Sequence, residues 1–292
     1  MFAVTGATGK VGGAVARALR DAGKAVRVVI RDAGKVEAWA ARGCEIAVAD
    51  VHDTASLTSA FAGVEGAFVM LPPLFDPSPG FPEARKMITT LRSALLAAKP
   101  AKIIVLSTIG ADAVQPNLLN QLKLLEEALA DMPIPVSFLR AAWFMENAAW
   151  DVAPARADGT IPSYLQPLDQ SFPMVSSEDV GCCAAELLLE TWRGNRVVEL
   201  EGPRRVSPND IAAAFAKSLG QNVKASLVAR DTWETLFRDQ GMQNPAPRIQ
   251  MLDGFNAGWI DFVQHGAGAR KGTITIDQAI ATLVRGMPAD AG

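Results

Sequence analysis

The stretch AVTGATGKVGGAV, residues 3–15, places four glycines and two threonines where the chain has just begun. The residues before the first glycine are apolar or β-branched, and Val11, Val15 and Leu19 follow at helical spacing. This pattern predicts a strand, a tight turn and a helix. Glycine lets the backbone bend sharply or approach a ligand, and the turn directs the free amides of the first helical turn at whatever lies above them. Together with the helix dipole, these amides favour an anion such as a pyrophosphate.

The spacing of the glycines narrows the class of ligand. The chain has a GxxGxxG pattern rather than the GxGxxG of ordinary dehydrogenases. A P-loop for nucleoside triphosphates is excluded, because Val4 and Val11 stand where it requires glycine and Ser or Thr. The alternative is a turn that only packs a helix on a sheet. We predict that the turn contacts a dinucleotide through Gly6, Thr8, Gly9, Lys10, Val11 and Gly12.

The segment AVRVVIRD, residues 25–32, predicts a buried parallel strand with Arg31 at its end. In dinucleotide-binding folds, an acidic residue about 20 positions after the glycines holds the ribose 2′-hydroxyl, whereas an arginine there accommodates a 2′-phosphate. Arg31 takes that place and Lys35 follows it, so the sequence favours NADP over NAD. Asp32 is the residue that argues for NAD.

Strand and helix patterns alternate as far as residue 141, joined by short links. Such alternation predicts an α/β fold with a doubly wound parallel sheet. Ligands bind these sheets beyond the carboxyl ends of the strands. The residues expected at that edge are Asp50, 70–73, 107–109 (with Ser107 as a cofactor contact) and 141–147.

Beyond Asn147 the pattern loosens, and residues 154–174 predict loops rather than a linker between independent domains. A helix with Ser207 before Pro208 in a capping arrangement follows a predicted strand. Apolar residues at helical spacing also predict a helix over 248–262. We therefore expect a dinucleotide-binding Rossmann domain over 1–150 and a mainly substrate-side α/β region over 151–292. Residues from about 176 to 202 are expected to return to the Rossmann core.

The composition and charge of the chain limit the kinds of partner that it can bind. The 292 residues are 49% hydrophobic and carry a net charge of −3, without long blocks of one sign. No apolar run reaches the length of a membrane helix, and nothing in the charge pattern indicates a nucleic-acid or membrane surface. We expect a cytoplasmic protein with a small-molecule partner. The two histidines and three cysteines lack metal-ligand spacing, so we expect no metal.

At this point the chain resembles a known family, through VTGATGKVGGAV, VRVVIRD, ADV, IIVLST, LKLLEEAL and FLRAAWFMEN. The resemblance is to the NmrA-like group of atypical short-chain dehydrogenases/reductases, which includes NAD(P)H-dependent quinone and azo reductases and redox-sensing regulators. It covers residues 1 to about 190 and is looser beyond. The sequence departs from the family at Ala141, where proline is usual. The resemblance implies that Asp50 and Val51 lie near the adenine, Leu71 and Pro72 near the ribose and nicotinamide, and Trp143 and Phe144 beside the nicotinamide pocket.

The proton donor of ordinary short-chain reductases is missing. Those enzymes protonate a ketone oxygen with a tyrosine four residues before a lysine. Lys123 lies in the expected helix, but Leu119 stands four residues before it. The single tyrosine, Tyr164, has Leu168 four residues after it. Ketone chemistry by such a pair is therefore not expected.

Two functions remain open. In the first, NADPH passes hydride to a quinone-like or other flat electrophilic acceptor, whose reduced form is a stabilised phenolate that water can protonate. The protein then contributes positioning. Lys123 would hold the nicotinamide ribose or stabilise developing charge; its alternative is a solvated lysine paired with Glu127.

The predicted contacts with the acceptor come from several segments. The proline-rich loop 74–84, which carries Phe75, is either a lid or a rigid surface loop. In the family the C-terminal helices roof the pocket, which brings in Phe255. The acceptor is expected to contact Phe75, Trp143, Phe144, Asn147 and Phe255.

In the second function, the protein binds NADP without turnover and reports its level to a regulatory partner. An epimerase or dehydratase ranks lower, because it would also require the Tyr-Lys pair. The sequence does not determine the oligomeric state.

Overall fold

The computed structural model describes residues 1–31, 34 and 36–286. Contacts divide the chain into two compact units. Unit 1 comprises 1–111, 119–140 and 177–198, and unit 2 comprises 112–118, 141–176 and 199–292. The predicted domain boundary was residue 150, and the boundary between the two units falls ten residues earlier, after Arg140. Residues 177–198, which lie inside the segment expected to return, pack with unit 1.

The central element is a sheet in the order β12-β10-β6-β5-β4-β1-β2-β3. β1 pairs in parallel with both β2 and β4, so that Phe2 lies opposite Val26 on one side and Gly66 on the other. The predicted doubly wound parallel sheet is confirmed. The strands are β1 (Phe2–Thr5), β2 (Val26–Ile30), β3 (Glu45–Val48), β4 (Gly66–Val69), β5 (Ile103–Thr108), β6 (Val136–Ala141), β10 (Asn195–Glu201) and β12 (Arg270–Lys271).

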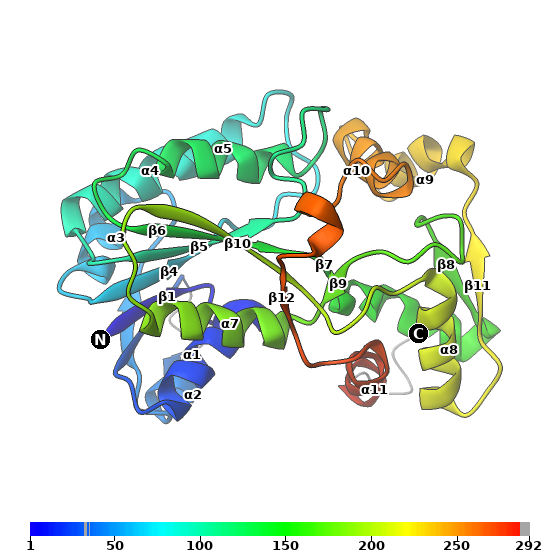
Figure 1. Cartoon of the computed structure of the whole chain (residues 1–292), viewed down its shortest axis with the longest axis horizontal. Helices are drawn as coiled ribbons and strands as arrows, with labels where there is room; N and C mark the ends of the chain where they lie inside the picture. The colour runs from blue at the N-terminus through cyan, green and yellow to red at the C-terminus, as the bar shows by residue number, and fades with distance from the viewer. Residues whose placement is uncertain (32–33, 35, 287–292) are drawn as a thin grey trace. The chain divides into compact units, whose positions relative to one another are not determined.

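Helices cover both faces of this sheet in unit 1 (Figure 1). α3 (Thr54–Phe61), α4 (Pro82–Ala98) and α5 (Asn120–Leu129) lie on one face, and α1 (Lys10–Asp21) and α7 (Ser177–Leu189) lie on the other. α2 (Val36–Ala40) is a short helix that the sequence analysis did not predict; its Trp39 packs near Gly13 of α1.

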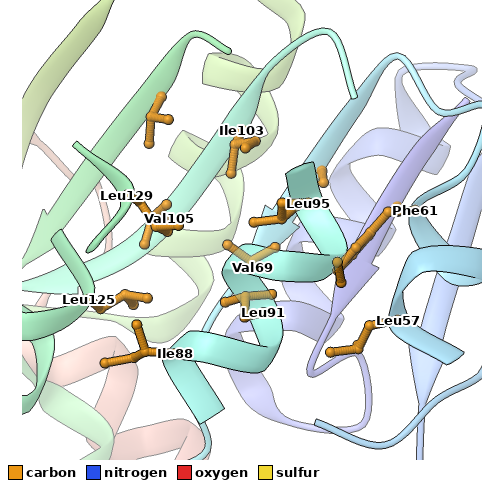
Figure 2. Close-up of a cluster of buried hydrophobic side chains, with 14 of the residues drawn as sticks. Leu57, Phe61, Val69, Ile88, Leu91, Leu95, Ile103, Val105, Leu125 and Leu129 are labelled. Atoms are coloured by element: carbon orange, nitrogen blue, oxygen red, sulfur yellow. The ribbon is translucent and has the colours of Figure 1, made fainter. Parts of the chain in front are cut away.

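The core of unit 1 lies under α3, α4 and α5 (Figure 2). Apolar side chains recur at helical spacing on α4 and meet the β-branched side chains of β4 and β5. Burial of each such side chain contributes roughly 1.5–3 kcal/mol. This core packs α3, α4 and α5 against the sheet whose strand ends border the site. Its labelled members are Leu57, Phe61, Val69, Ile88, Leu91, Leu95, Ile103, Val105, Leu125 and Leu129.

On the opposite face, α7 crosses α1 at very short range. A β-carbon at Gly181 would lie 2.2 Å from the β-carbon of Ala14 and 2.8 Å from the amide nitrogen of Val15. Only glycine fits at this crossing. The close approach fixes α1, whose N-terminus follows the glycine turn.

Unit 2 contains two small parallel pairs, β7 with β9 and β8 with β11. The predicted cap of α8 is confirmed: Ser207 Oγ accepts from the amide of Asp210, and the Asp210 carboxylate accepts from the amide of Ser207. The elements are β7 (Trp143–Phe144), η2 (Met145–Asp151), α6 (Val152–Asp158), β8 (Thr160–Ser163), β9 (Met174–Val175), α8 (Pro208–Leu219), β11 (Lys224–Leu227), η3 (Arg230–Thr232), α9 (Trp233–Asp239), α10 (Ala246–Asn256), η4 (Val263–Gly266) and α11 (Ile276–Gly286).

The helix predicted over 248–262 is wrong at its C-terminal end, because α10 ends at Asn256. Gly258 has a φ of +77° and its amide donates to the carbonyl of Phe255, which turns the chain. The ring of Trp259 then folds back over Gly254, where a β-carbon would lie 2.5 Å from it. The apolar spacing reflected two separate segments that pack on each other.

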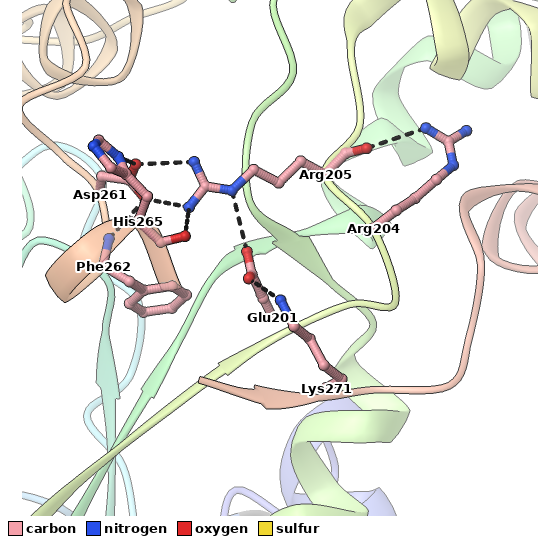
Figure 3. A network of polar contacts seen from close by, with 7 residues as sticks. All are labelled: Glu201, Arg204, Arg205, Asp261, Phe262, His265 and Lys271. Carbon is pink, nitrogen blue, oxygen red and sulfur yellow. Dashed lines mark hydrogen bonds and ion pairs between the residues drawn. The ribbon is translucent and has the colours of Figure 1, made fainter. Parts of the chain in front are cut away.

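A polar network stabilises the segment around η4 (Figure 3). Arg205 binds both carboxylate oxygens of Asp261, at 2.9 and 2.7 Å, and donates to the carbonyl of His265 at 2.8 Å. Glu201, which is nearly buried, pairs with Arg205 and Lys271. Gln264 and His265 have positive φ, which costs non-glycine residues free energy. The network therefore holds a conformation that these residues would not adopt alone.

We expect Gly181→Ala to destabilise the protein by about 1–3 kcal/mol, because α7 must move away from α1 to accommodate a methyl group. The measurement is the free energy of unfolding from urea denaturation. Gly268→Ala is the control, since the space around Gly268 is open and its φ is not positive. Equal stability of the two variants would contradict the packing argument.

Candidate functional site

The glycine turn is fixed by close packing as well as by its φ angles. Gly6 has a φ of +66°, and a β-carbon there would lie 2.6 Å from the sulfur of Met70. A β-carbon at Gly12 would lie 2.4 Å from the carbonyl group of Gly6. Thr5 Oγ1 accepts from the amide of Met70, which ties the end of β1 to the end of β4. Both glycines are thus required to bring the start of α1 against β1.

The start of α1 carries free amides. Its N-cap is Gly9, in an extended conformation, and no side chain caps the helix. The amide of Gly9 donates to the carbonyl of Gly6 at 2.9 Å, whereas the amides of Lys10, Val11 and Gly12 are the first-turn donors that have no partner within a helix. No acidic residue lies in this turn. The arrangement suits an anion with several oxygens.

A hollow of about 500 Å³ adjoins the turn. Of the predicted contacts, Thr8 and Gly9 border it, whereas Arg31 is exposed and does not line it. Lys35 lies outside the described residues. The cations of this hollow, Arg17 and Arg42, were not predicted from the sequence, where a short helix over 36–40 followed by Gly43 was the available signal. The described residues that line it are Ala7, Thr8, Gly9, Arg17, Gly34, Glu37, Ala38, Trp39 and Arg42.

The predicted contacts after β3 and β4 differ in exposure. Asp50 is exposed, and one of its carboxylate oxygens accepts from the amide of His52 at 2.8 Å. Val51 is half-buried. Leu71 is buried and Pro72 is exposed. All four follow strands that end at the carboxyl edge, and their contacts with a cofactor stay predictions.

A buried ionic group lies at the ends of β5 and β6. Ser107, 2% exposed, donates to Glu126 at 2.5 Å. Arg140, the last residue of unit 1 before the Trp143 segment, binds both oxygens of Glu126 at 2.9 and 2.7 Å. The side chains of Arg140 and Glu126 are 11% and 12% exposed. Ser107 was selected from the sequence as a cofactor contact, whereas its partner Glu126 and the Arg140 that binds Glu126, 19 and 33 positions further along the chain, were not.

Lys123 lies on α5, one turn before Glu126, and its side chain is half-buried. Among the described residues it forms no ion pair, so the pairing with Glu127 that was its alternative is not formed. Phe75 lies in the loop between β4 and α4 and is 65% exposed. The catalytic and cofactor-binding roles of Lys123 and the contact of Phe75 with the acceptor stay predictions.

The remaining predicted contacts lie in unit 2. Trp143 and Phe255 meet edge to face, with ring centroids 5.2 Å apart. Phe255 is 3% exposed, while Trp143 and Phe144 are half-buried and Asn147 is exposed. The segment after Ala141 is held by main-chain hydrogen bonds from the Ala142 and Trp143 amides to the carbonyls of Leu200 and Pro173. These bonds fix the chain path at the position where the family usually has proline.

The single tyrosine, Tyr164, packs among aromatic side chains. Its ring packs against Trp233 and Phe237, with centroids 5.6 and 5.2 Å away. It therefore belongs to an aromatic cluster of unit 2, in keeping with the absence of a Tyr-Lys pair from the sequence.

Two features are absent from the residues that the structure describes. These residues contain no group of three or more His, Cys, Asp or Glu side chains placed to bind a metal ion. None of the helices there is both long and apolar enough to cross a membrane.

A doubly wound parallel sheet with an uncapped helix N-terminus above a glycine turn defines the class of Rossmann-type nucleotide-binding folds. The chain belongs to the NmrA-like family, whose sequence model matches residues 1–263. The family resemblance noted from the sequence motifs is confirmed.

Two curated relatives cover most of the chain. Quinone oxidoreductase 2 of Escherichia coli is 30% identical over 290 residues, which are 99% of this chain and 94% of the relative. NAD(P)H azoreductase of Xenophilus azovorans is 27% identical over 253 residues, 83% of this chain and 82% of the relative.

Solved structures share the fold. An NADPH-dependent quinone oxidoreductase from Escherichia coli, in complex with NADPH, has a TM-score of 0.80 at 24% identity and covers 97% of this chain and 99% of that chain. The triphenylmethane reductase of Citrobacter has a TM-score of 0.77 at 20% identity, with the same coverage of both chains. These likenesses establish the Rossmann-type fold.

We expect Arg140→Met to destabilise the protein by about 3 kcal/mol, because it leaves the Glu126 carboxylate largely buried without its cation. The double variant Glu126→Leu/Arg140→Met should recover most of that loss, since it removes both charges together. Urea denaturation measures both. A single variant as stable as the wild type would show that Glu126 is not held by Arg140.

Asp151, at the end of η2, provides a pH-dependent prediction. Burial raises the pKa of its carboxyl group to about 7, well above its value in an unfolded chain. The folded protein therefore holds a proton that the unfolded chain releases, so stability falls as pH rises from about 4 to 7 and is then constant. Between pH 5.5 and 8.5, we expect the wild type to lose about 1–2 kcal/mol more than Asp151→Asn, which cannot ionise. Parallel pH profiles of the unfolding free energy would contradict this.

Proposed function

We propose that this protein is an NADPH-dependent oxidoreductase that transfers hydride to a quinone-like or other flat electrophilic acceptor. The observation that carries the proposal is the uncapped first turn of α1 above Gly6 and Gly9, beside a hollow that contains arginine side chains. This arrangement suits the pyrophosphate and the adenosine end of a dinucleotide. The names of the quinone and azo reductase relatives support the reaction class.

The chain's residues would act mainly by positioning. Bound NADPH supplies the hydride. The amides of Lys10, Val11 and Gly12 hold the pyrophosphate, and Lys123, whose ammonium group forms no ion pair among the described residues, holds the nicotinamide ribose or stabilises charge that develops on the acceptor. A quinone needs no strong protein acid, because its reduced form is a phenolate that water protonates. This agrees with Leu119 in the place of the usual tyrosine and with the packing of Tyr164 among aromatic side chains.

The acceptor is proposed to contact aromatic side chains. Trp143 is half-buried and held at a fixed angle by Phe255, so it offers a flat apolar surface whose orientation is already set. Stacking on such a ring favours planar acceptors. Phe144, Asn147 and Phe75 are further proposed contacts.

A binding protein without turnover is the second candidate. It is favoured by one observation: the position four residues before Lys123 carries leucine, so the usual proton donor of short-chain reductases is missing. Such a protein would report the level of NADP to a regulatory partner.

The experiment is turnover of NADPH with a panel of quinones, followed by the loss of NADPH absorbance. We expect steady turnover by the wild type. Trp143→Ala should raise KM for the quinone about 5- to 10-fold while KM for NADPH changes little, because it removes about 1 kcal/mol or more of aromatic contact. Trp150→Ala is the matched control, since that tryptophan is 89% exposed.

The outcomes separate the two candidates. Tight NADPH binding without turnover on any acceptor would establish the sensor and reject the enzyme. Absence of binding of either NADPH or NADH would reject both. Turnover that is unaffected by Trp143→Ala would leave the enzyme but remove Trp143 from the acceptor site.

A further inference from the structure

The hollow beside the glycine turn contains two arginines that come from different elements. Arg17 lies on α1, and Arg42 lies in the turn after α2. A second hollow of about 250 Å³ shares both arginines and is also lined by Arg20. The arginines thus lie next to the amides of the first turn of α1, a turn that carries no acidic side chain of its own, although Glu37 also lines the first hollow.

Trp39 packs between α1 and the turn that carries Arg42. Its side chain is 8% exposed and packs against α1 at Gly13, where a β-carbon would lie 3.8 Å from the Trp39 ring and 3.3 Å from an Arg17 nitrogen. The guanidinium carbon of Arg42 lies 5.7 Å from the centroid of the same ring, within cation–π range. Arg20 donates to the carbonyl of Arg42 at 3.1 Å, which restrains the turn that carries it.

The two arginines differ in their partners. Arg17 is engaged, because one of its nitrogens lies 2.5 Å from a carboxylate oxygen of Glu178. Arg42 is exposed and forms no ion pair with any described residue. Glu37, on the same hollow, is also exposed and forms none. An arginine held over an aromatic ring without a carboxylate is available to an incoming anion, and its planar fork suits a phosphate group.

We infer that Arg42 is a specificity-determining residue that binds the 2′-phosphate on the adenosine end of the dinucleotide, with Arg17 as a second, weaker cation. The inference rests on the proposed dinucleotide binding and goes beyond it, because it moves the main phosphate contact from the end of β2 to the turn after α2. Arg31, predicted for this role from its place in the sequence, is exposed but does not line the hollow. Glu37 opposes the same phosphate by like-charge repulsion.

The test uses two nucleotide fragments, so that it does not depend on activity. Isothermal titration calorimetry compares adenosine 2′,5′-bisphosphate with adenosine 5′-monophosphate, which differ only by the 2′-phosphate. Arg42→Gln should weaken the bisphosphate about 5- to 20-fold and leave the monophosphate nearly unchanged, as expected for loss of one charge-assisted contact. Arg193→Gln, an exposed arginine outside the hollow, removes the same charge and should change neither.

Glu37→Gln gives a second result of opposite sign. Removal of its negative charge should tighten the bisphosphate about 2- to 3-fold, with no change for the monophosphate. Circular dichroism confirms that each variant is folded, and both substitutions are at exposed positions. Arg31→Gln, measured in parallel, should weaken the bisphosphate less than Arg42→Gln does.

Distinct results overturn the inference and the proposed function. If the wild type binds NADPH but Arg42→Gln has no effect, or weakens both fragments equally, the inference is wrong and dinucleotide binding stands. If Glu37→Gln weakens the monophosphate, the hollow is built for an unphosphorylated ribose and the inference is wrong. If the wild type binds neither the fragments nor NADPH or NADH, the proposed function itself fails.

Discussion

The crossing of α1 over the end of β1 is the constraint on which the candidate site depends. Gly12 and Gly6 meet with no space for a β-carbon at Gly12, and Gly6 turns the chain with a positive φ under the sulfur of Met70. This contact sets where the free amides of the first turn of α1 lie. Beside α1 on the same face of the sheet, Gly181 lets α7 approach equally closely. The helix is therefore fixed on two sides, and its N-terminus is positioned without any side-chain cap.

The rest of unit 1 supports that geometry through its core. α3, α4 and α5 cover the other face of the sheet with closely packed apolar side chains, so the strand ends that carry Asp50, Leu71 and Ser107 are held in register. The polar groups at the ends of β5 and β6 bind one another: Ser107 donates to Glu126, and Arg140 neutralises the Glu126 carboxylate. The cofactor contact of Ser107 stays a prediction. The first-turn amides of α1 and the guanidinium of Arg42 differ from this buried ionic group, because neither has an anionic partner among the described residues.

The charged side chains around η4 in unit 2 pair with one another. Around η4, Arg205, Asp261, Glu201 and Lys271 pair with each other and hold two residues with positive φ (Figure 3). Arginine therefore stabilises the backbone through ion pairs in unit 2, whereas Arg42 of unit 1 forms no ion pair with any described residue, although Glu37 lines the same hollow. The arginine beside the turn has an aromatic ring beneath it instead of a carboxylate.

The sequence by itself determined the elements whose signals are local. The glycine turn, the alternating strands and helices, the cap at Ser207 and the absence of a Tyr-Lys pair all follow from residues within a few positions of each other, because turn geometry, periodicity and capping act over that range. The tertiary structure alone decided what depends on distant residues meeting. Glu126 and Arg140 form one buried group with Ser107, and Trp39 packs against Gly13 of α1, so that Arg17 and Arg42 line the same hollow beside the glycine turn. These contacts have no signature in the sequence. They arise from packing between different elements, and the number of residues between two elements does not determine how close they lie in space.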